Sequence, residues 1–146
     1  MIDLAAVSHT GRELDLMLAG RKPLAMFYAE LSELPEEGLI PELAFAPYVE
    51  SNRFLREASV VDGGYSEILK RPTKVKYVYF ASPEEAWRIR ATILLKAAFS
   101  EANCHWSEAL ERIECHLLGY SKEETDAWCA HSPVLKSLRD RLDARA

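Results

Sequence analysis

The chain has 146 residues, of which 49% are hydrophobic and 28% charged, and its formal net charge is −5. This length fits one domain spanning residues 1–146, and a chain of this size buries roughly two thirds of its unfolded surface. The modest acidic balance argues against a nucleic-acid binder, which usually carries a basic excess, and every long apolar stretch is interrupted by charges, which argues against a membrane span.

The first third of the chain predicts a short helix and one strand. Thr10 and Glu13 have the spacing of a capping box, and the helix they would begin should end at Gly20. The apolar run over residues 24–29 predicts a buried strand. Residues 31–52 contain several prolines and no persistent period, so we expect a long connection with one helical turn near residues 41–45.

The middle of the chain predicts the rest of a sheet. Residues 54–61 have the composition of a second strand, and Asp62-Gly63-Gly64 has that of a turn that would end it. A short return strand would follow over residues 65–69. The clearest strand covers residues 74–81, which are rich in β-branched and aromatic side chains. The lysines near its start are interpreted as protection of a strand edge rather than as a nucleic-acid site.

Helical signals dominate after residue 81. Ser82-Pro83 predicts a helix start, and that helix should reach about Phe99. A second helix is expected over residues 106–118, ending at Gly119. Ser121 and Glu124 form a capping box for a short third helix, and Ser132-Pro133 begins a charged final one. Strands followed by helices predict an α+β fold, with a small antiparallel sheet of three or four strands packed against the C-terminal helices.

Residues 104–131 hold all the cysteines and all but one of the histidines, which raises the question of a metal site. Cys104 and Cys115 are eleven residues apart, a helical rise of about 16 Å, which is too far for one shared ion. We therefore predict no metal and no cofactor. Cys104, His105 and His131 remain the candidate ligands if a turn were to fold the first pair back.

A helical wheel for residues 106–118 places Trp106, Ala109, Leu110, Ile113 and Leu117 on one apolar stripe. Cys115 then lies nearly opposite, beside Arg112, and is expected to be exposed or to face a partner. Leu118 also lies off the stripe, and Trp128 is on a helix too short to be stable alone. The candidate binding residues are therefore Trp128, Leu118, Cys115 and Arg112.

Candidates for catalysis are weaker, because the sequence has no recognised catalytic motif. Cys115 and His116 are the candidate nucleophile and base, but adjacent helical residues diverge by about 100°, so they cannot pair directly. Arg88 and Arg90 interrupt an otherwise apolar helix. They would either hold an anion or pair with the neighbouring Glu84 and Glu85.

These observations favour a small non-enzymatic protein-interaction module, such as a regulator, inhibitor or adaptor, whose partner is another protein or a second copy of the chain. An odd number of cysteines and the lack of a signal-peptide pattern suggest the cytoplasm. The alternative is a small enzyme acting on an anionic substrate, with a Cys/His/Arg site between the sheet and the C-terminal helices.

Overall fold

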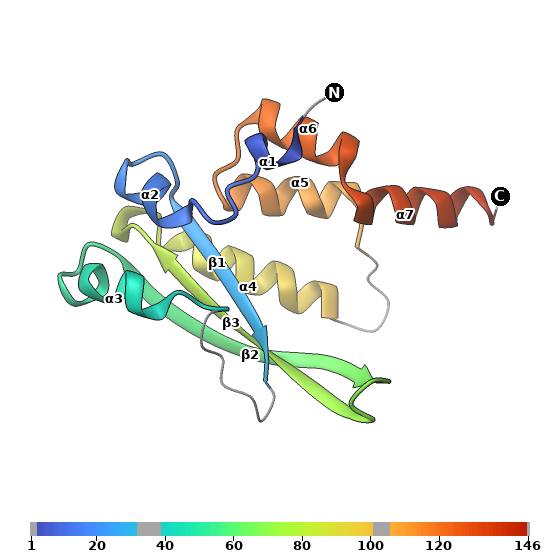
Figure 1. Ribbon diagram of the computed structural model, residues 1–146, viewed down its shortest axis with the longest axis horizontal. Helices are drawn as coiled ribbons and strands as arrows, with labels where there is room; N and C mark the ends of the chain where they lie inside the picture. The colour runs from blue at the N-terminus through green and yellow to red at the C-terminus, as the bar shows by residue number, and fades with distance from the viewer. Residues whose placement is uncertain (1–2, 32–38, 101–105, 146) are drawn as a thin grey trace.

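The computed structural model describes residues 3–31, 39–100 and 106–145 (Figure 1). The elements follow one another in the order α1 (Leu4–Val7), α2 (Glu13–Leu18), β1 (Leu24–Glu30), α3 (Glu42–Glu50), β2 (Leu55–Ser66), β3 (Arg71–Ala81), a 3-10 turn (Pro83–Glu85), α4 (Trp87–Ser100), α5 (Glu108–Leu117), α6 (Lys122–His131) and α7 (Pro133–Asp143). The predicted α+β class, with a small antiparallel sheet and C-terminal helices, is confirmed.

The sheet has the strand order β1-β3-β2, with both pairings antiparallel. The apolar end of β3 is therefore covered on both edges, and Ala81 lies opposite Leu24 of β1 and Leu55 of β2. Val78 to Ala81 are buried, as expected for a central strand of aromatic and β-branched side chains. The distal end of the β2–β3 hairpin extends beyond β1, whose pairing stops at Glu30 opposite Val75.

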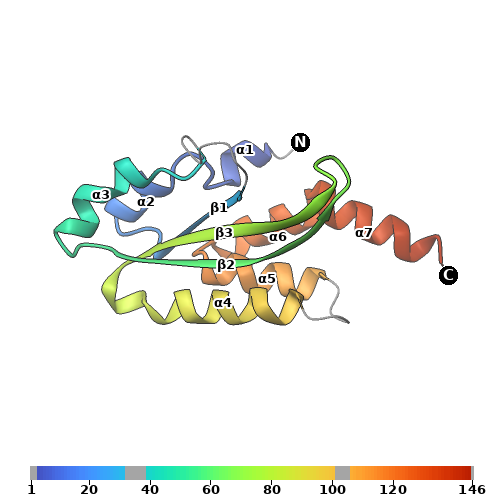
Figure 2. The same cartoon turned by 90° about the horizontal axis from the view of Figure 1, so that it is seen from below.

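Alternation along the strands gives the sheet two apolar faces, each covered by helices (Figure 2). On the first face, Val78 and Phe80 pack with Met17 of α2 and Phe45 of α3. On the second face, Tyr79 and Ala81 pack with Ile89 of α4. The second face also carries the side chains of Met26 and Tyr77, and this is the side on which α4 and α5 lie (Figure 2).

Three local predictions in the first half are wrong. Thr10 does not cap α2, which begins at Glu13 without a side-chain cap, because Gly11 turns the chain at φ +81° in between. Residues 42–50 form a full helix rather than one turn, despite an internal proline. Its stability comes from tertiary packing, since the Phe45 ring stacks on Phe80 with centroids 4.1 Å apart.

The glycine pair of β2 is also not the predicted turn. The register of β2 against β3 shifts between Asp62 and Gly64, which marks a bulge, and β2 continues to Ser66 before the hairpin turns. A Cβ atom on Gly63 would lie 2.7 Å from Oγ1 of Thr73. Glycine is therefore required for close approach of the two strands, and the predicted return strand over residues 65–69 is instead the end of β2 and the turn.

Two predicted helix starts of the C-terminal half are confirmed, whereas Ser82 makes no capping hydrogen bond and α4 begins only at Trp87. Ser121 and Glu124 form a complete capping box at α6, and the Ser132 side chain accepts a hydrogen bond from the Leu135 N–H at α7. Pro83 begins a single 3-10 turn that leads into α4. α7 leads away from the sheet, and the C-terminus lies at its far end (Figure 1). Within the described residues, no helix combines the length and apolar character needed to cross a membrane.

The first face of the sheet provides a matched test of core packing on α3. Phe45 is 1% exposed, whereas Leu43 on the same helix is 91% exposed. Phe45→Ala should lower the free energy of unfolding by about 3–5 kcal/mol, because it leaves a cavity against Phe80. Leu43→Ala should change it by less than about 0.5 kcal/mol. Urea unfolding followed by circular dichroism measures both, and equal losses would contradict this packing.

Candidate functional site

Helix α5 buries only part of the face that its apolar pattern indicated, namely Leu117, and it also buries residues from outside that face. Glu114, Cys115 and Leu117 are buried, whereas Ala109 is exposed and Ile113 is 49% exposed. Cys115, expected on the outer side, is only 5% exposed. The wheel was misleading because it included Trp106, which precedes the helix, and because polar contacts rather than apolar side chains determine which face of α5 turns inward.

The C-terminus of α5 is held by a Schellman motif and by two cations. Gly119 adopts φ +84°, and the Tyr120 N–H donates to the Cys115 carbonyl at 3.0 Å. Arg88 of α4 donates to the carbonyls of His116 and Leu117 at 2.7 and 3.2 Å. Cations are favourable at this end of a helix because the last carbonyl groups carry a partial negative charge.

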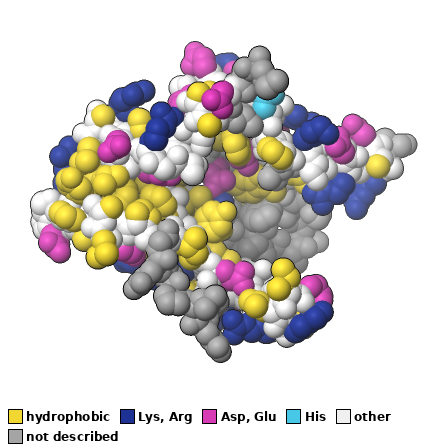
Figure 3. Space-filling model, in the orientation of Figure 1, with side chains coloured by type: hydrophobic (Ala, Val, Ile, Leu, Met, Phe, Trp, Pro, Cys, Tyr) yellow, Lys and Arg dark blue, Asp and Glu magenta, His cyan; other side chains and the backbone are white. Residues whose placement is uncertain are grey.

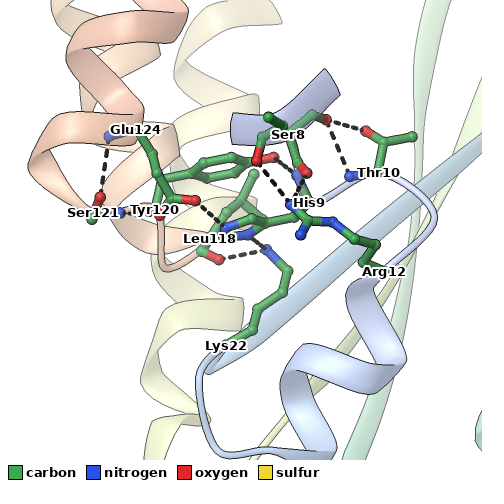
Figure 4. Close-up of polar contacts among 10 residues, drawn as sticks. Ser8, His9, Thr10, Arg12, Lys22, Leu118, Tyr120, Ser121 and Glu124 are labelled. Carbon is green, nitrogen blue, oxygen red and sulfur yellow. Dashed lines mark hydrogen bonds and ion pairs between the residues drawn. The ribbon is translucent and has the colours of Figure 1, made fainter. Parts of the chain in front are cut away.

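The second cation belongs to a buried polar cluster around His9 (Figure 4). Lys22 Nζ lies 2.6 Å from the Leu118 carbonyl and 2.9 Å from His9 Nδ1, and His9 Nε2 lies 3.0 Å from the Glu124 carboxylate. The His9 ring stacks on Tyr120 with centroids 3.8 Å apart. The cluster joins the segment before α2 to the start of β1 and to the α5–α6 connection.

The donors in this cluster fix the tautomer of His9. A lysine ammonium only donates, so Nδ1 accepts and the proton lies on Nε2, which donates to Glu124. Burial lowers the pKa of His9, and the charge of Lys22 lowers it further against the opposing effect of Glu124. Burial also lowers the pKa of Lys22 to about 8. The cluster is therefore arranged to hold a neutral imidazole between a cation and a carboxylate.

Beside this cluster, a cavity of about 840 Å³ lies between the second face of the sheet and helices α4 to α7. We call it the sheet–helix cleft. Its aromatic walls are Tyr28, Tyr77, Trp106, Tyr120 and Trp128, and its charged side chains are Lys96, Glu111, Glu114 and Arg141. Figure 3 shows a hollow near the middle of this view, with hydrophobic side chains around it and acidic side chains within. A cavity of this size accommodates a small molecule or a few side chains of a partner.

Glu111 is the carboxylate at which the two tryptophans of the cleft converge. Trp106 Nε1 donates to Glu111 Oε2 at 2.5 Å, and Trp128 Nε1 donates to Glu111 Oε1 at 2.7 Å. One donor on each carboxylate oxygen holds both the carboxylate and the indole rings in place. The result is a preorganised carboxylate between aromatic walls, which is a favourable arrangement for recognition.

A buried ion pair lies beside Glu111. Lys96 Nζ of α4 is 2.6 Å from the carboxylate of Glu114, and both side chains are largely buried. The ammonium also lies 5.6 Å from the Tyr77 ring centroid and 5.1 Å from that of Trp106. Burial raises the pKa of Glu114 against the opposing effect of Lys96, and burial likewise raises the pKa of Tyr77.

Three of the four binding residues predicted from the sequence line this cleft, namely Cys115, Leu118 and Trp128. Arg112 does not, because it donates to Glu108 and Asp126 on the exposed side of α5 and α6. A role in binding stays a prediction for each of them. Cys115 is buried and lines the cleft, so the expectation that it is exposed is wrong. The alternative expectation, that it faces a partner, stays a prediction.

The four candidate catalytic residues do not converge. Arg88 pairs with Glu85, as the salt-bridge alternative predicted, and Arg90 is 3.4 Å from Glu57 of β2. Burial raises the pKa of Cys115 to about 12, with a further contribution from Glu111, so its thiol stays protonated at neutral pH. The His116 side chain is exposed, and only its carbonyl takes part in the contact with Arg88.

Of the candidate metal ligands, Cys104 and His105 lie outside the described residues, and the His131 side chain is exposed at the end of α6. Over residues 3–31, 39–100 and 106–145, no three His, Cys, Asp or Glu side chains are grouped to hold an ion.

Sequence reasoning missed Glu111, Lys96 and Tyr28. Lys96 was visible as a charge inside an apolar helix, a signal that a buried partner was needed. Nothing in the sequence places that partner on α5, or brings Trp106 and Trp128 to one carboxylate. Comparison with protein-family models, with curated proteins and with solved structures finds no match to this chain. The geometry of the cleft is therefore the basis for a functional inference.

The His9 cluster predicts how stability depends on pH. In the folded protein the pKa of His9 lies below the ordinary 6.5. As the pH falls, His9 therefore binds a proton in the unfolded chain before it does so in the folded protein. The contribution of His9 to the free energy of unfolding should therefore be constant above about pH 7 and decrease as the pH falls through 6.5. His9→Gln should flatten this decrease in urea unfolding between pH 7.5 and 5.5. His131→Gln, at an exposed position, should preserve it, and equal slopes in the two variants would contradict the burial of a neutral His9.

Proposed function

We propose that the protein is a non-enzymatic interaction module that receives part of a protein partner in the sheet–helix cleft. The observation that carries this proposal is the Glu111 carboxylate, which is fixed by hydrogen bonds from Trp106 and Trp128 inside a cavity. Tryptophan and tyrosine are the residues most enriched at the energetic centres of protein interfaces. Here the two tryptophans are held by hydrogen bonds to Glu111, so these side chains lose little conformational entropy when a partner binds.

The layout of the cleft is also that of an interface. Its interior carries aromatic side chains and the compensated Lys96–Glu114 pair, whereas Tyr28 is 64% exposed and Arg141 is also exposed. Enrichment in aromatic residues with an accessible margin is common in protein contacts, and here the aromatic residues also surround the Glu111 carboxylate. A regulator, inhibitor or adaptor would use such a surface without performing chemistry.

The enzyme alternative has less support. It needs a free arginine for an anionic substrate and an activated nucleophile, and the groups proposed for those roles are otherwise engaged. Arg88 donates to Glu85 and to the end of α5, and burial disfavours the Cys115 thiolate. The site predicted between the sheet and the C-terminal helices does contain a cavity, but its charged groups are Lys96, Glu111 and Glu114.

Site-specific photo-crosslinking in cells tests this proposal. A benzophenone amino acid in place of Tyr28, on the accessible margin of the cleft, should give a discrete crosslinked partner that mass spectrometry identifies. The same amino acid in place of Leu43 is the matched control, because Leu43 is also exposed and lies on α3, against the first face of the sheet.

A crosslink at position 28 that is absent at position 43 supports the cleft as the contact surface. If the crosslinked product is a second copy of the chain, the partner is the chain itself and the module is a homodimer. Equal crosslinking at both positions, or none at position 28 in a correctly folded variant, would contradict the proposal.

A further inference from the structure

We infer that the sheet–helix cleft selects an organic cation, an alkylammonium or guanidinium group carried on a hydrocarbon stem. The inference rests on the proposed function only in taking the cleft as the binding site. It concerns the chemistry of what enters. Three features of the cleft support this inference. They are the Glu111 carboxylate, which no cation of the described residues contacts, the aromatic lining, and the Lys96 ammonium group already bound there.

Among the described residues, two cations and two carboxylates line the cleft, but only one cation and one carboxylate are in contact with each other. Lys96 and Glu114 compensate each other at 2.6 Å. Glu111 then remains, and within the described residues its carboxylate accepts two indole N–H groups and has no cationic partner. A carboxylate offers about four lone-pair sites, so two are left for an incoming donor. The indoles are neutral, so the negative charge of Glu111 is not compensated by them.

The residues that line the cleft with this carboxylate are largely aromatic, and the two indoles point their N–H edges at it. Tyr28 and Tyr77 lie side by side with ring centroids 5.7 Å apart, and Trp106 and Trp128 are fixed by Glu111 itself. Aromatic faces attract cations through their quadrupole, and a carboxylate beside them adds charge attraction. Cages of this composition bind alkylated ammonium groups, and the hydrocarbon part of the ligand packs on the rings.

The cleft already binds one group of this kind from the chain itself. The Lys96 ammonium lies over the rings of Tyr77 and Trp106 and contacts Glu114, so aromatic faces and a carboxylate hold it together. Glu111 is three residues before Glu114 and therefore lies one helical turn away on the same side of α5. With its two indole donors it forms a similar combination of carboxylate and aromatic rings, and no cation among the described residues contacts it.

An anionic ligand fits less well. Of the cations that line the cleft within the described residues, Lys96 lies over aromatic rings, and Glu114 already neutralises it. An anion entering the cleft would also approach the charge of Glu111 in a partly desolvated space, which is costly. Arg141 is the remaining cation of the lining, and its side chain is exposed on α7.

The cation has two possible sources, a lysine or arginine side chain of the partner and a free amine. The experiment uses purified Trp87→Phe protein, so that Trp106 and Trp128 of the cleft are the remaining fluorophores. Choline, butylguanidine and N-acetyl-arginine amide are titrated at low salt in phosphate buffer, because Tris is itself an organic cation. The matched neutral probe is 3,3-dimethylbutanol, which has the shape of choline without its charge.

We expect saturable changes in fluorescence with dissociation constants of about 1 mM, as is usual for fragments of this size. The neutral probe should bind at least about tenfold more weakly, because it loses the charge interaction with Glu111. Glu111→Gln should weaken choline binding by a similar factor. Glu123→Gln, at an exposed position of α6, is the control and should leave it unchanged.

Tyr28→Leu provides a second variant in case Glu111→Gln unfolds the protein, because Tyr28 is largely exposed. It should weaken choline binding about three- to tenfold through loss of a cation–π contact.

Stronger binding of N-acetyl-arginine amide than of choline would assign the cation to a protein side chain, and the reverse would assign it to a free amine. Equal binding of choline and its neutral analogue, or no binding of any cation, would overturn the inference. The proposed function would survive that result if the crosslink at position 28 persisted.

Discussion

The ion pair between Lys96 and Glu114 is the contact on which the arrangement of the second face depends. It joins α4 to α5 in a largely buried setting, where separating the partners would leave an uncompensated charge. Arg88 and Lys22 bind the carbonyl groups at the end of α5 and fix the helix along its axis. These charged contacts determine both the rotation and the position of α5. In this orientation Glu111 lies beside the two tryptophans, and the cleft lies between α5 and the sheet.

Local features of the fold were readable in the sequence, and the orientation of α5 was not. The strands at residues 24–29 and 74–81 and the serine caps of α6 and α7 depend on neighbours a few residues away. The buried face of α5 depends on a lysine in another helix, so a wheel built on hydrophobicity pointed Ile113 inward and Cys115 outward. The helix at residues 42–50 was predicted as only one turn for the same reason, since the Phe80 side chain that stabilises it is distant in the sequence.

In the candidate site, too, some residues could be predicted from their sequence neighbours and others depend on residues distant in the sequence. Trp128, Leu118 and Cys115 were singled out because they did not fit a local apolar stripe, and all three line the cleft. Glu111 and Tyr28 carried no local signal, because a single carboxylate and a single tyrosine become distinctive only when tryptophans and a buried ion pair surround them. Of the cysteines and histidines in residues 106–131, Cys115 and Cys129 are buried, His116 and His131 are exposed, and the described residues contain no group of three metal ligands. The function proposed here is accordingly one of recognition, based on rigid aromatic side chains and one uncompensated carboxylate.

The three indole N–H resonances in a nitrogen-15 correlation spectrum test the central claim most directly, since the chain has three tryptophans. The account predicts that adding an alkylammonium ion shifts the signals of Trp106 and Trp128 together, with one affinity, because both indoles donate to Glu111. The signal of Trp87, which lies outside the cleft, should stay in place. Unchanged signals for Trp106 and Trp128, or equal shifts of all three, would contradict a cation site at Glu111.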